Sequence, residues 1–162
     1  MDSRECYKGH DRVIAAIPQL VAMDHDICYA IVGEGDDRDR LEALAKGAGA
    51  VERVCFLCAL GLLNPVVTFH AADLFVMPSS GEGFGVTFLE AMASGTPAVG
   101  LGVAGAKDAL RDGELGTVTS ESELVTTTSS ILNQPKPNSF SSTQPFALVS
   151  TARSLWPSPA QF

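Results

Sequence analysis

The chain has 162 residues, a net charge of −8 at pH 7 and 46% apolar residues. That length fits one domain with a real core, and the apolar content excludes a disordered chain. The negative charge argues against non-specific binding to nucleic acid or to anionic membranes, because both require positively charged protein surfaces.

Helical and strand-like segments alternate from residue 10 to residue 132. In chain order we expect a helix from residue 10 to about residue 21, strand 27–32, helix 38–48, strand 53–57, short helix 64–72, strand 74–77, helix 84–94, strand 97–101, helical turn 106–111, strand 115–119 and helix 121–132. Apolar strands between helices predict an α/β fold with a doubly wound parallel sheet covered on both faces. Ligands bind such sheets at the carboxyl ends of the strands, which points to the loops 33–37, 78–85 and 102–106.

The composition changes near residue 125. After Glu123 there is no acidic residue, and five of the nine prolines follow, together with many Ser and Thr. We therefore expect one domain over residues 1–134 and a Ser/Pro-rich, poorly ordered tail over residues 135–162, with one short apolar element at 146–149.

The localisation signals are few. No apolar stretch reaches the ~18 residues of a transmembrane helix, and the charged N-terminus does not match a secretory signal. Four sparse cysteines are typical of free thiols in a reducing compartment, so we expect a cytoplasmic protein.

Residues 78–92 read PSSGEGFGVTFLEAM and place three glycines, Gly81, Gly83 and Gly85, between a predicted strand and a predicted helix. Glycine allows sharp turns and lets a ligand approach the backbone N–H groups closely. The start of a helix adds N–H donors and the positive end of the helix dipole. The loop therefore predicts an anion site suited to phosphate.

Two carboxylates flank this loop. Glu82 lies within it, and Glu90 lies in the apolar stretch 86–92, where a charged group is costly unless it finds hydrogen-bond donors. The hydroxyl groups of a ribose would provide such donors. A Glu90 that simply faces water or caps a backbone N–H fits the spacing equally well.

The spacing Glu82-x7-Glu90 in PSSGEGFGVTFLEAMASGTPAV resembles the E-x7-E signature of retaining glycosyltransferases in the group 1 family. Four further blocks resemble the family in order and spacing: KGHDRVIAAIP, YAIVGEGDDRDRLEALA, HAADLFVMPSS and ALRDGELGTV. The resemblance implies the Rossmann-like, donor-binding second domain of the two-domain GT-B architecture.

The resemblance also implies roles for individual residues. Glu82 would face the hydroxyl groups of the donor sugar near the reacting carbon, and Glu90 would bind the nucleotide ribose. Lys8 would contact the pyrophosphate and stabilise the charge of the leaving group. The backbone of four consecutive residues would hold sugar and phosphate: Gly83, Phe84, Gly85 and Val86.

For the intact enzyme, the resemblance implies transfer of a hexose from a nucleotide diphosphate sugar to a carbohydrate or lipid acceptor, at the inner membrane face, with retention of configuration. No metal is expected, since cationic side chains replace Mg²⁺. For the chemistry of retention, the family offers two alternatives, a covalent intermediate and a same-face front-side path, and the sequence leaves both open.

The sequence departs from the family at several places. The family has an acceptor-binding domain and a first, internal sheet strand before this region, so we expect a truncated chain with exposed strand edges. The pyrophosphate arginine of the family would lie upstream of Met1, or Arg4 would replace it. Cys58 and Ala104 stand where the family has glycine.

Three other patterns have simpler explanations than ligand binding. Cys55-x-x-Cys58 has no second pair, so we expect buried structural thiols. The pair Gly33 and Gly35 lacks the third glycine of a dinucleotide fingerprint. The acidic cluster Asp36, Asp37 and Asp39 is typical of a solvated helix start.

Two other functions compete with the enzyme. A nucleotide-sugar-binding module without catalysis would keep Glu90 and need another chain for transfer. A generic doubly wound signalling domain would have no nucleotide affinity and no role for Glu90.

Overall fold

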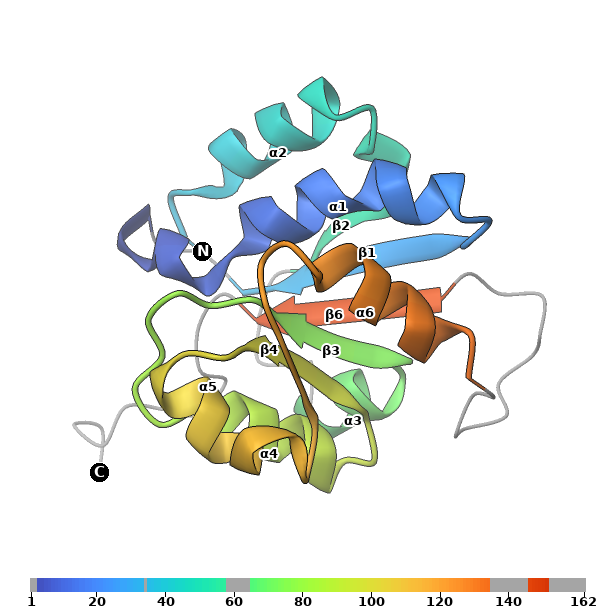
Figure 1. Ribbon diagram of the computed structural model, residues 1–162. Coiled ribbons are helices and arrows are strands. Elements are labelled where there is room, and N and C mark those ends of the chain that lie inside the picture. Colours follow the sequence, from blue (N-terminus) through green and yellow to red (C-terminus); the bar gives the residue numbers. More distant parts are fainter. Residues whose placement is uncertain (1–2, 34, 58–64, 135–145, 152–162) are drawn as a thin grey trace.

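The computed structural model describes residues 3–33, 35–57, 65–134 and 146–151. They form three layers, with one sheet between two layers of helices (Figure 1). The strands are β1 Ile27–Val32, β2 Val54–Leu57, β3 Leu74–Met77, β4 Ala98–Leu101, β5 Thr117–Thr119 and β6 Phe146–Thr151. The α-helices are α1 His10–Ala22, α2 Arg38–Gly47, α3 Pro65–His70, α4 Val86–Ala93, α5 Ala104–Ala109 and α6 Leu124–Leu132. Short 3₁₀ helices are η1 Ser3–Lys8, η2 Val51–Arg53 and η3 Arg111–Gly113.

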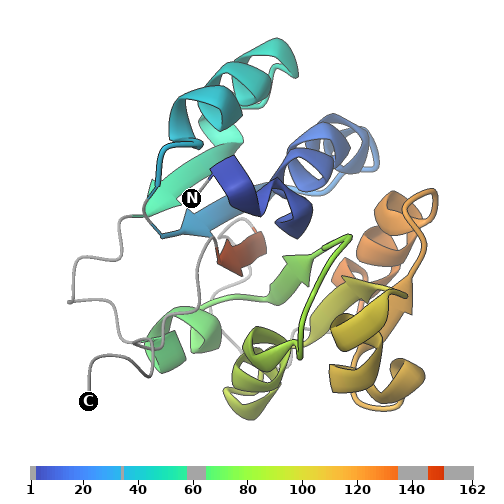
Figure 2. The ribbon, with the colours of Figure 1, turned by 90° about the vertical axis from the view of Figure 1, so that its left-hand side faces the viewer.

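The sheet has the strand order β2-β1-β6-β3-β4-β5, and all of its neighbouring strands are parallel. Viewed from the carboxyl edge, helices lie on both sides of it (Figure 2). The predicted doubly wound parallel sheet is therefore confirmed.

Each face of the sheet has its own apolar core. On one face α1, α2 and α6 bury Ile14, Leu41 and Leu132 against β1 and β3. On the other face α3, α4 and α5 bury a second cluster that contains Phe75 and Phe88. The ring of Phe75 makes edge-to-face contacts with Phe69, at 5.5 Å between centroids, and with Phe88, at 5.4 Å. The continuous apolar strands of the sequence are thus explained by burial on both faces.

The short apolar element expected at 146–149 is present as the strand β6, but it does not lie in a tail. The predicted boundary at residue 134 does not hold for Phe146–Thr151, because this segment is hydrogen-bonded between β1 and β3 in the middle of the sheet. Six of its residues are in register with β1, from Ile27↔Phe146 to Val32↔Thr151. Figure 2 shows its red arrow between the blue and green strands.

The position of β6 also changes the expectation of exposed strand edges. Loss of the first, internal strand of the family predicts exposed strand edges, whereas β6 here lies between β1 and β3. The short apolar segment could not reveal its place in the sheet from the sequence, because strand order is decided by long-range pairing. The remainder of the predicted tail, 135–145 and 152–162, lies outside the described residues.

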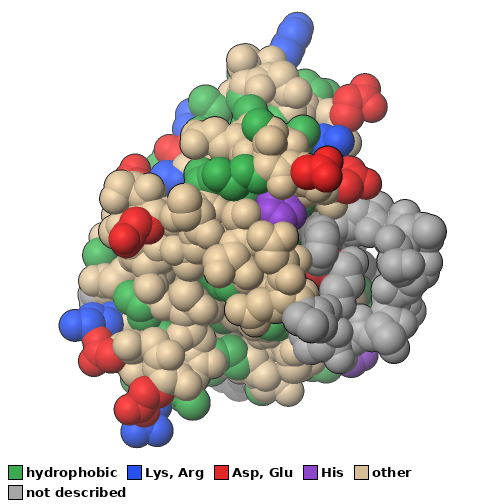
Figure 3. Space-filling view, turned by 45° about the vertical axis from the view of Figure 1, so that its right-hand side comes forward, with side chains coloured by type: hydrophobic (Ala, Val, Ile, Leu, Met, Phe, Trp, Pro, Cys, Tyr) green, Lys and Arg blue, Asp and Glu red, His purple; other side chains and the backbone are tan. Residues whose placement is uncertain are grey.

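The surface of the described residues carries charges of both signs. On the face drawn in Figure 3, acidic and basic side chains are interspersed, and this face has no continuous basic patch among them. None of the helices in the described ranges combines the length and apolar character that a membrane-spanning helix requires.

Hydrogen exchange tests the central position of β6. In the intact chain, the amides of residues 147–150 should exchange about as slowly as those of β1 and β3, because all three strands share one hydrogen-bond ladder. Mass spectrometry of peptides that cover 146–151 measures this. Exchange at the rate of an unfolded peptide would show that the segment is a tail.

Candidate functional site

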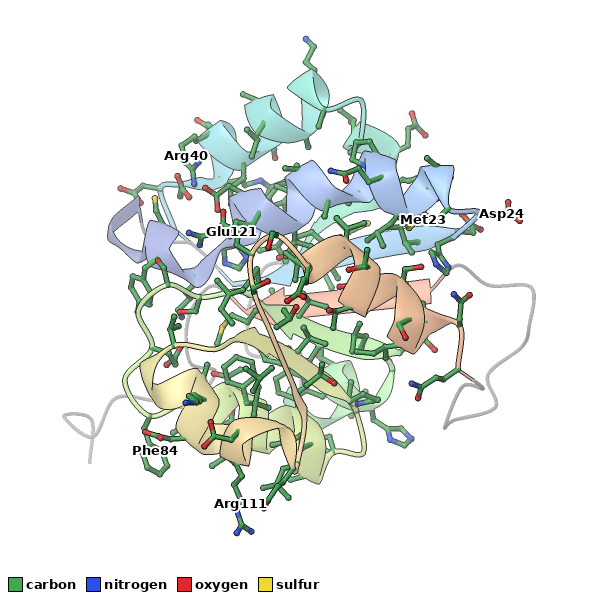
Figure 4. The ribbon with its side chains drawn as sticks, in the orientation of Figure 1. Met23, Asp24, Arg40, Phe84, Arg111 and Glu121 are labelled. Atoms are coloured by element: carbon green, nitrogen blue, oxygen red, sulfur yellow. The ribbon has the colours of Figure 1, made fainter. Side chains whose placement is uncertain are left out.

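Four loops meet at the carboxyl edge of the sheet. They are the segment before α1, the β1–α2 loop, the β3–α4 loop with its glycines, and the β4–α5 loop. Figure 4 shows Arg40, Glu121 and Phe84 at this end of the molecule, and Met23 and Asp24 at the opposite end. The predicted convergence of the loops 33–37, 78–85 and 102–106 is the arrangement expected for a parallel sheet.

The segment before α1 is in direct contact with the start of the glycine-rich loop. The backbone N–H of Ser80 donates to the carbonyl of Tyr7 at 2.7 Å. Gly9 has a φ of +78°, and any Cβ on it would overlap the carbonyl oxygen of Pro78. Only glycine satisfies both conditions, so the Lys8–Gly9 pair is held beside the loop 78–85.

The other end of the loop packs against α5. Gly85 precedes α4 with a φ of +73°, and a Cβ there would lie 2.7 Å from the carbonyl oxygen of Gly105. The N–H of Gly105 donates to the carbonyl of Glu82 at 3.2 Å. Within the described part of the chain, no side chain caps the N-terminus of α4.

Lys8 lies at the end of η1 and is only 7% exposed. The next helix begins with the buried His10, whose Nδ1 lies 3.0 Å from the hydroxyl of Tyr29. Burial, followed by the positive charge of Lys8, lowers the pKa of His10 to about 4. His10 is therefore neutral at pH 7, and Lys8 and Arg40 are the cationic side chains near its ring.

Glu90 is half-buried and lies on α4, the helix that directly follows the glycine-rich loop. Its Oε2 is buried and accepts no hydrogen bond from any residue that the structure describes. Burial raises the pKa of Glu90. A buried acceptor normally has a hydrogen-bond partner, so Oε2 is an exception among the described residues, while the Glu90 side chain as a whole is half-buried.

The remaining predicted residues surround the same loop. Glu82 is half-buried, and Gly83 is exposed. Phe84 is 68% exposed and Val86 is 48% exposed. Their side chains contribute little to the core, so the structure leaves the loop surface open at the carboxyl edge.

One acidic residue of the β1–α2 region corrects the expectation of a solvated cluster, while Asp36 and Asp39 are exposed as expected. Asp37 is not solvated but 4% exposed, and its two oxygens accept from Arg40 Nε at 2.6 Å and from an Arg40 NH₂ group at 2.8 Å. A bidentate pair of this kind fixes the loop instead of leaving a free acidic cluster. Across the described ranges, no three His, Cys, Asp or Glu side chains lie close enough to share a metal ion.

The cysteine expectation is also wrong in part. Cys55 is exposed, and its Sγ lies 3.6 Å from Sγ of the half-buried Cys28 on the neighbouring strand. Burial, followed by the Cys55 thiol, raises the pKa of Cys28 to about 11. Cys58 lies outside the described residues.

Sequence reasoning missed Arg12. This residue lies in the first turn of α1, where the helix dipole disfavours a cation, and its guanidinium donates to the carbonyl of Pro78 at 3.1 Å. The unfavourable position is the signal that could have found it, since a cation at a helix start needs a compensating partner.

A family model described as "Glycosyl transferases group 1" matches residues 3–142 of the chain. The chain belongs to this family. The fold agrees with the crystal structure of WaaG, a glycosyltransferase involved in lipopolysaccharide biosynthesis. That comparison has a TM-score of 0.69 and 30% identity, and it covers 82% of this chain and 36% of the other.

Curated relatives of this glycosyltransferase chain include two mycobacterial enzymes. One is the D-inositol 3-phosphate glycosyltransferase of Mycobacterium marinum, 38% identical over 70% of this chain and 24% of its own length. Another is the GDP-mannose-dependent alpha-(1-6)-phosphatidylinositol monomannoside mannosyltransferase of Mycolicibacterium smegmatis, 36% identical over 68% of this chain and 31% of its own. The matched part of the chain thus spans 24% and 31% of the length of these two relatives.

The close approach of Gly9 to Pro78 can be tested with alanine. Gly9→Ala should lower the free energy of unfolding by about 3 kcal/mol, since a strained φ and an overlap with Pro78 add together. Gly49→Ala is the matched control, because Gly49 has a φ of +68° with nothing within 4 Å. It should lose only about 1 kcal/mol. Equal losses in urea unfolding would contradict the contact.

The raised pKa of Glu90 predicts a pH dependence. The folded state holds the Glu90 proton to a higher pH than the unfolded state, so ionisation costs stability as the pH rises above about 4. Glu90→Gln should therefore have a higher Tm than the parent chain at neutral pH, and the difference should disappear in acid. Glu52→Gln, at an exposed position, is the control and should show no such trend in thermal unfolding.

Proposed function

We propose that this chain forms the donor half of a retaining glycosyltransferase and binds a nucleotide diphosphate sugar at the carboxyl edge of its sheet. The intact enzyme would transfer the hexose to a carbohydrate or lipid acceptor through a further domain. The observation that carries the proposal is the buried Oε2 of Glu90, which has no hydrogen-bond partner among the described residues. Glu90 belongs to α4, the helix that directly follows the glycine-rich loop.

A nucleoside diphosphate supplies what this oxygen lacks. The neighbouring hydroxyls of a ribose can donate two hydrogen bonds to one carboxylate, and a buried charged acceptor gains more from such bonds than an exposed one. Ligand binding would also hold Glu90 in its ionised form.

The diphosphate would lie between Lys8 and the N-terminus of α4. Lys8 is buried beside the loop, and α4 begins without a side-chain cap, so its N–H groups and dipole can face an anion. These groups would neutralise the charge that develops on the leaving diphosphate, a task that a metal ion performs in other transferases. The proposal therefore includes no metal.

The sugar would lie over the loop backbone at residues 83–86, with Glu82 directed to its hydroxyls near the reacting carbon. The half-buried position of Glu82 and the open surface around Phe84 support this placement. Retention of configuration is proposed because the sequence of this loop resembles that of retaining enzymes. Both a covalent intermediate and a same-face front-side path are compatible with it.

Thermal unfolding with GDP-mannose, UDP-glucose and ADP-glucose tests the donor site. A ligand at 100 times its Kd adds about 2.7 kcal/mol to the free energy of unfolding. One of these donors should raise the Tm of the chain, and it should not raise the Tm of Glu90→Gln, although that variant folds more stably at neutral pH. Glu52→Gln should respond as the parent does. A melt that no nucleotide sugar shifts would reject the donor site.

The same experiment separates the two carboxylates. Glu82→Gln should weaken the response to the nucleotide sugar and leave the response to the free nucleotide unchanged, because Glu82 would touch only the sugar. Glu90→Gln should weaken both. The reverse pattern would contradict the assigned roles.

The buried Oε2 of Glu90 fits one alternative equally well, a nucleotide-sugar-binding module that does not transfer sugar by itself, because this oxygen concerns binding and not transfer. Such a module would pass the binding experiment. It would show no sugar transfer until a separate acceptor domain is added.

A further inference from the structure

Arg12 connects three parts of the fold. From the first turn of α1, its guanidinium donates to the carbonyl oxygen of Pro78 at 3.1 Å, and its Nε lies 3.1 Å from Oε1 of Glu121. Pro78 directly follows β3, and Glu121 belongs to the connection between β5 and α6. Figure 4 shows Glu121 close to the start of α1 at the carboxyl edge.

The carbonyl of Pro78 is the point at which the glycine-rich loop leaves the sheet. β3 ends at Met77, so the direction of the loop is determined by the peptide planes that follow. Arg12 in α1 and Gly9 just before it both approach this carbonyl. Two residues further along the loop, the backbone N–H of Ser80 donates to the carbonyl of Tyr7. The first residues of the loop are therefore held by contacts with the N-terminal region of α1.

The two contacts of Arg12 differ in strength. The side chain of Glu121 is 65% exposed, and an exposed ion pair is weakened by water and salt. The side chain of Arg12 is 25% exposed, and its bond to a buried carbonyl is charge-assisted. The bond to Pro78 is thus the contact that restrains the loop, while Glu121 orients the guanidinium.

We propose that Arg12 is a positioning residue for nucleotide-sugar binding: it holds the Pro78 carbonyl, and thereby the glycine-rich loop, in the conformation that receives a nucleoside diphosphate. Arg12 does not itself touch the ligand. The inference rests on the proposed function, since it concerns the same loop.

Isothermal titration of the intact chain tests it, with whichever of GDP-mannose, UDP-glucose and ADP-glucose stabilises the parent most. Arg12→Gln should weaken binding by roughly tenfold, about 1.4 kcal/mol, at a temperature well below its Tm. Arg12→Lys keeps one cationic donor and should recover part of the loss. Glu121→Gln keeps the bond to Pro78 and should bind within about twofold of the parent.

Arg38→Gln is the matched control. Arg38 pairs with Glu42 on the exposed surface of α2, so this variant changes the net charge equally without touching the loop. It should bind as the parent does. Loss of affinity in Arg38→Gln equal to that in Arg12→Gln would assign the effect to net charge and overturn the inference.

Hydrogen exchange of residues 79–85 in the free chain gives a second measurement. It should be faster in Arg12→Gln than in the parent, and unchanged in Glu121→Gln and Arg38→Gln. If Arg12→Gln does not fold, the comparison is made with Arg12→Lys, which should show smaller changes of the same sign.

The outcomes are distinguishable. Failure of the parent chain to bind any nucleotide sugar rejects the proposed function and this inference with it. Binding by the parent together with unchanged affinity in Arg12→Gln, even at a lower Tm, rejects the positioning role alone and leaves Arg12 as a structural residue.

Discussion

The contact between the start of α1 and the carbonyl of Pro78 holds the carboxyl edge together. Gly9 lacks a side chain and adopts a positive φ, which lets the backbone of one segment lie directly against the backbone of another. Two groups 69 residues apart in the sequence are thereby locked at van der Waals distance. Every group assigned to the donor site, from Lys8 to Glu90, depends on that alignment, because Lys8 precedes Gly9 and the glycine-rich loop begins at Pro78.

The same principle operates at the other end of the loop. Gly85 and Gly105 let the starts of α4 and α5 approach each other, and the N–H of Gly105 binds the carbonyl of Glu82. The loop is consequently held by backbone contacts at both ends, with its middle exposed. A loop of this kind can present N–H groups to an anion without losing its shape, which lowers the entropy cost of binding.

The polar groups of the edge fall into two classes. Asp37 and Arg40 satisfy each other and so stabilise the β1–α2 loop, whereas the contact between His10 Nδ1 and the Tyr29 hydroxyl accounts for only one of the two ring nitrogens of His10. Glu90 is different, since one of its oxygens is buried without a partner in the described part of the chain. An unsatisfied acceptor lowers stability and is retained where a ligand completes it, which is why the proposed function rests on Glu90 and not on the glycines.

The sequence by itself determined the order and type of the elements and the family resemblance. Burial on both faces produces continuous apolar strands, and helical spacing locates the helices approximately, although the helix expected over 84–94 begins only at Val86, after Gly85. The spacing Glu82-x7-Glu90 likewise needed no coordinates. These features are local, so a linear pattern records them.

Only the tertiary structure decided which distant groups meet. The place of β6 depends on pairing with β1, 119 residues earlier in the chain, and with β3, 74 residues earlier, and its short apolar run carries no information about these neighbours. The burial of Asp37, the exposure of Cys55 and the bond from Arg12 to Pro78 have the same cause. Solvent exposure and long-range hydrogen bonds are properties of packing, and packing is settled only when the layers come together.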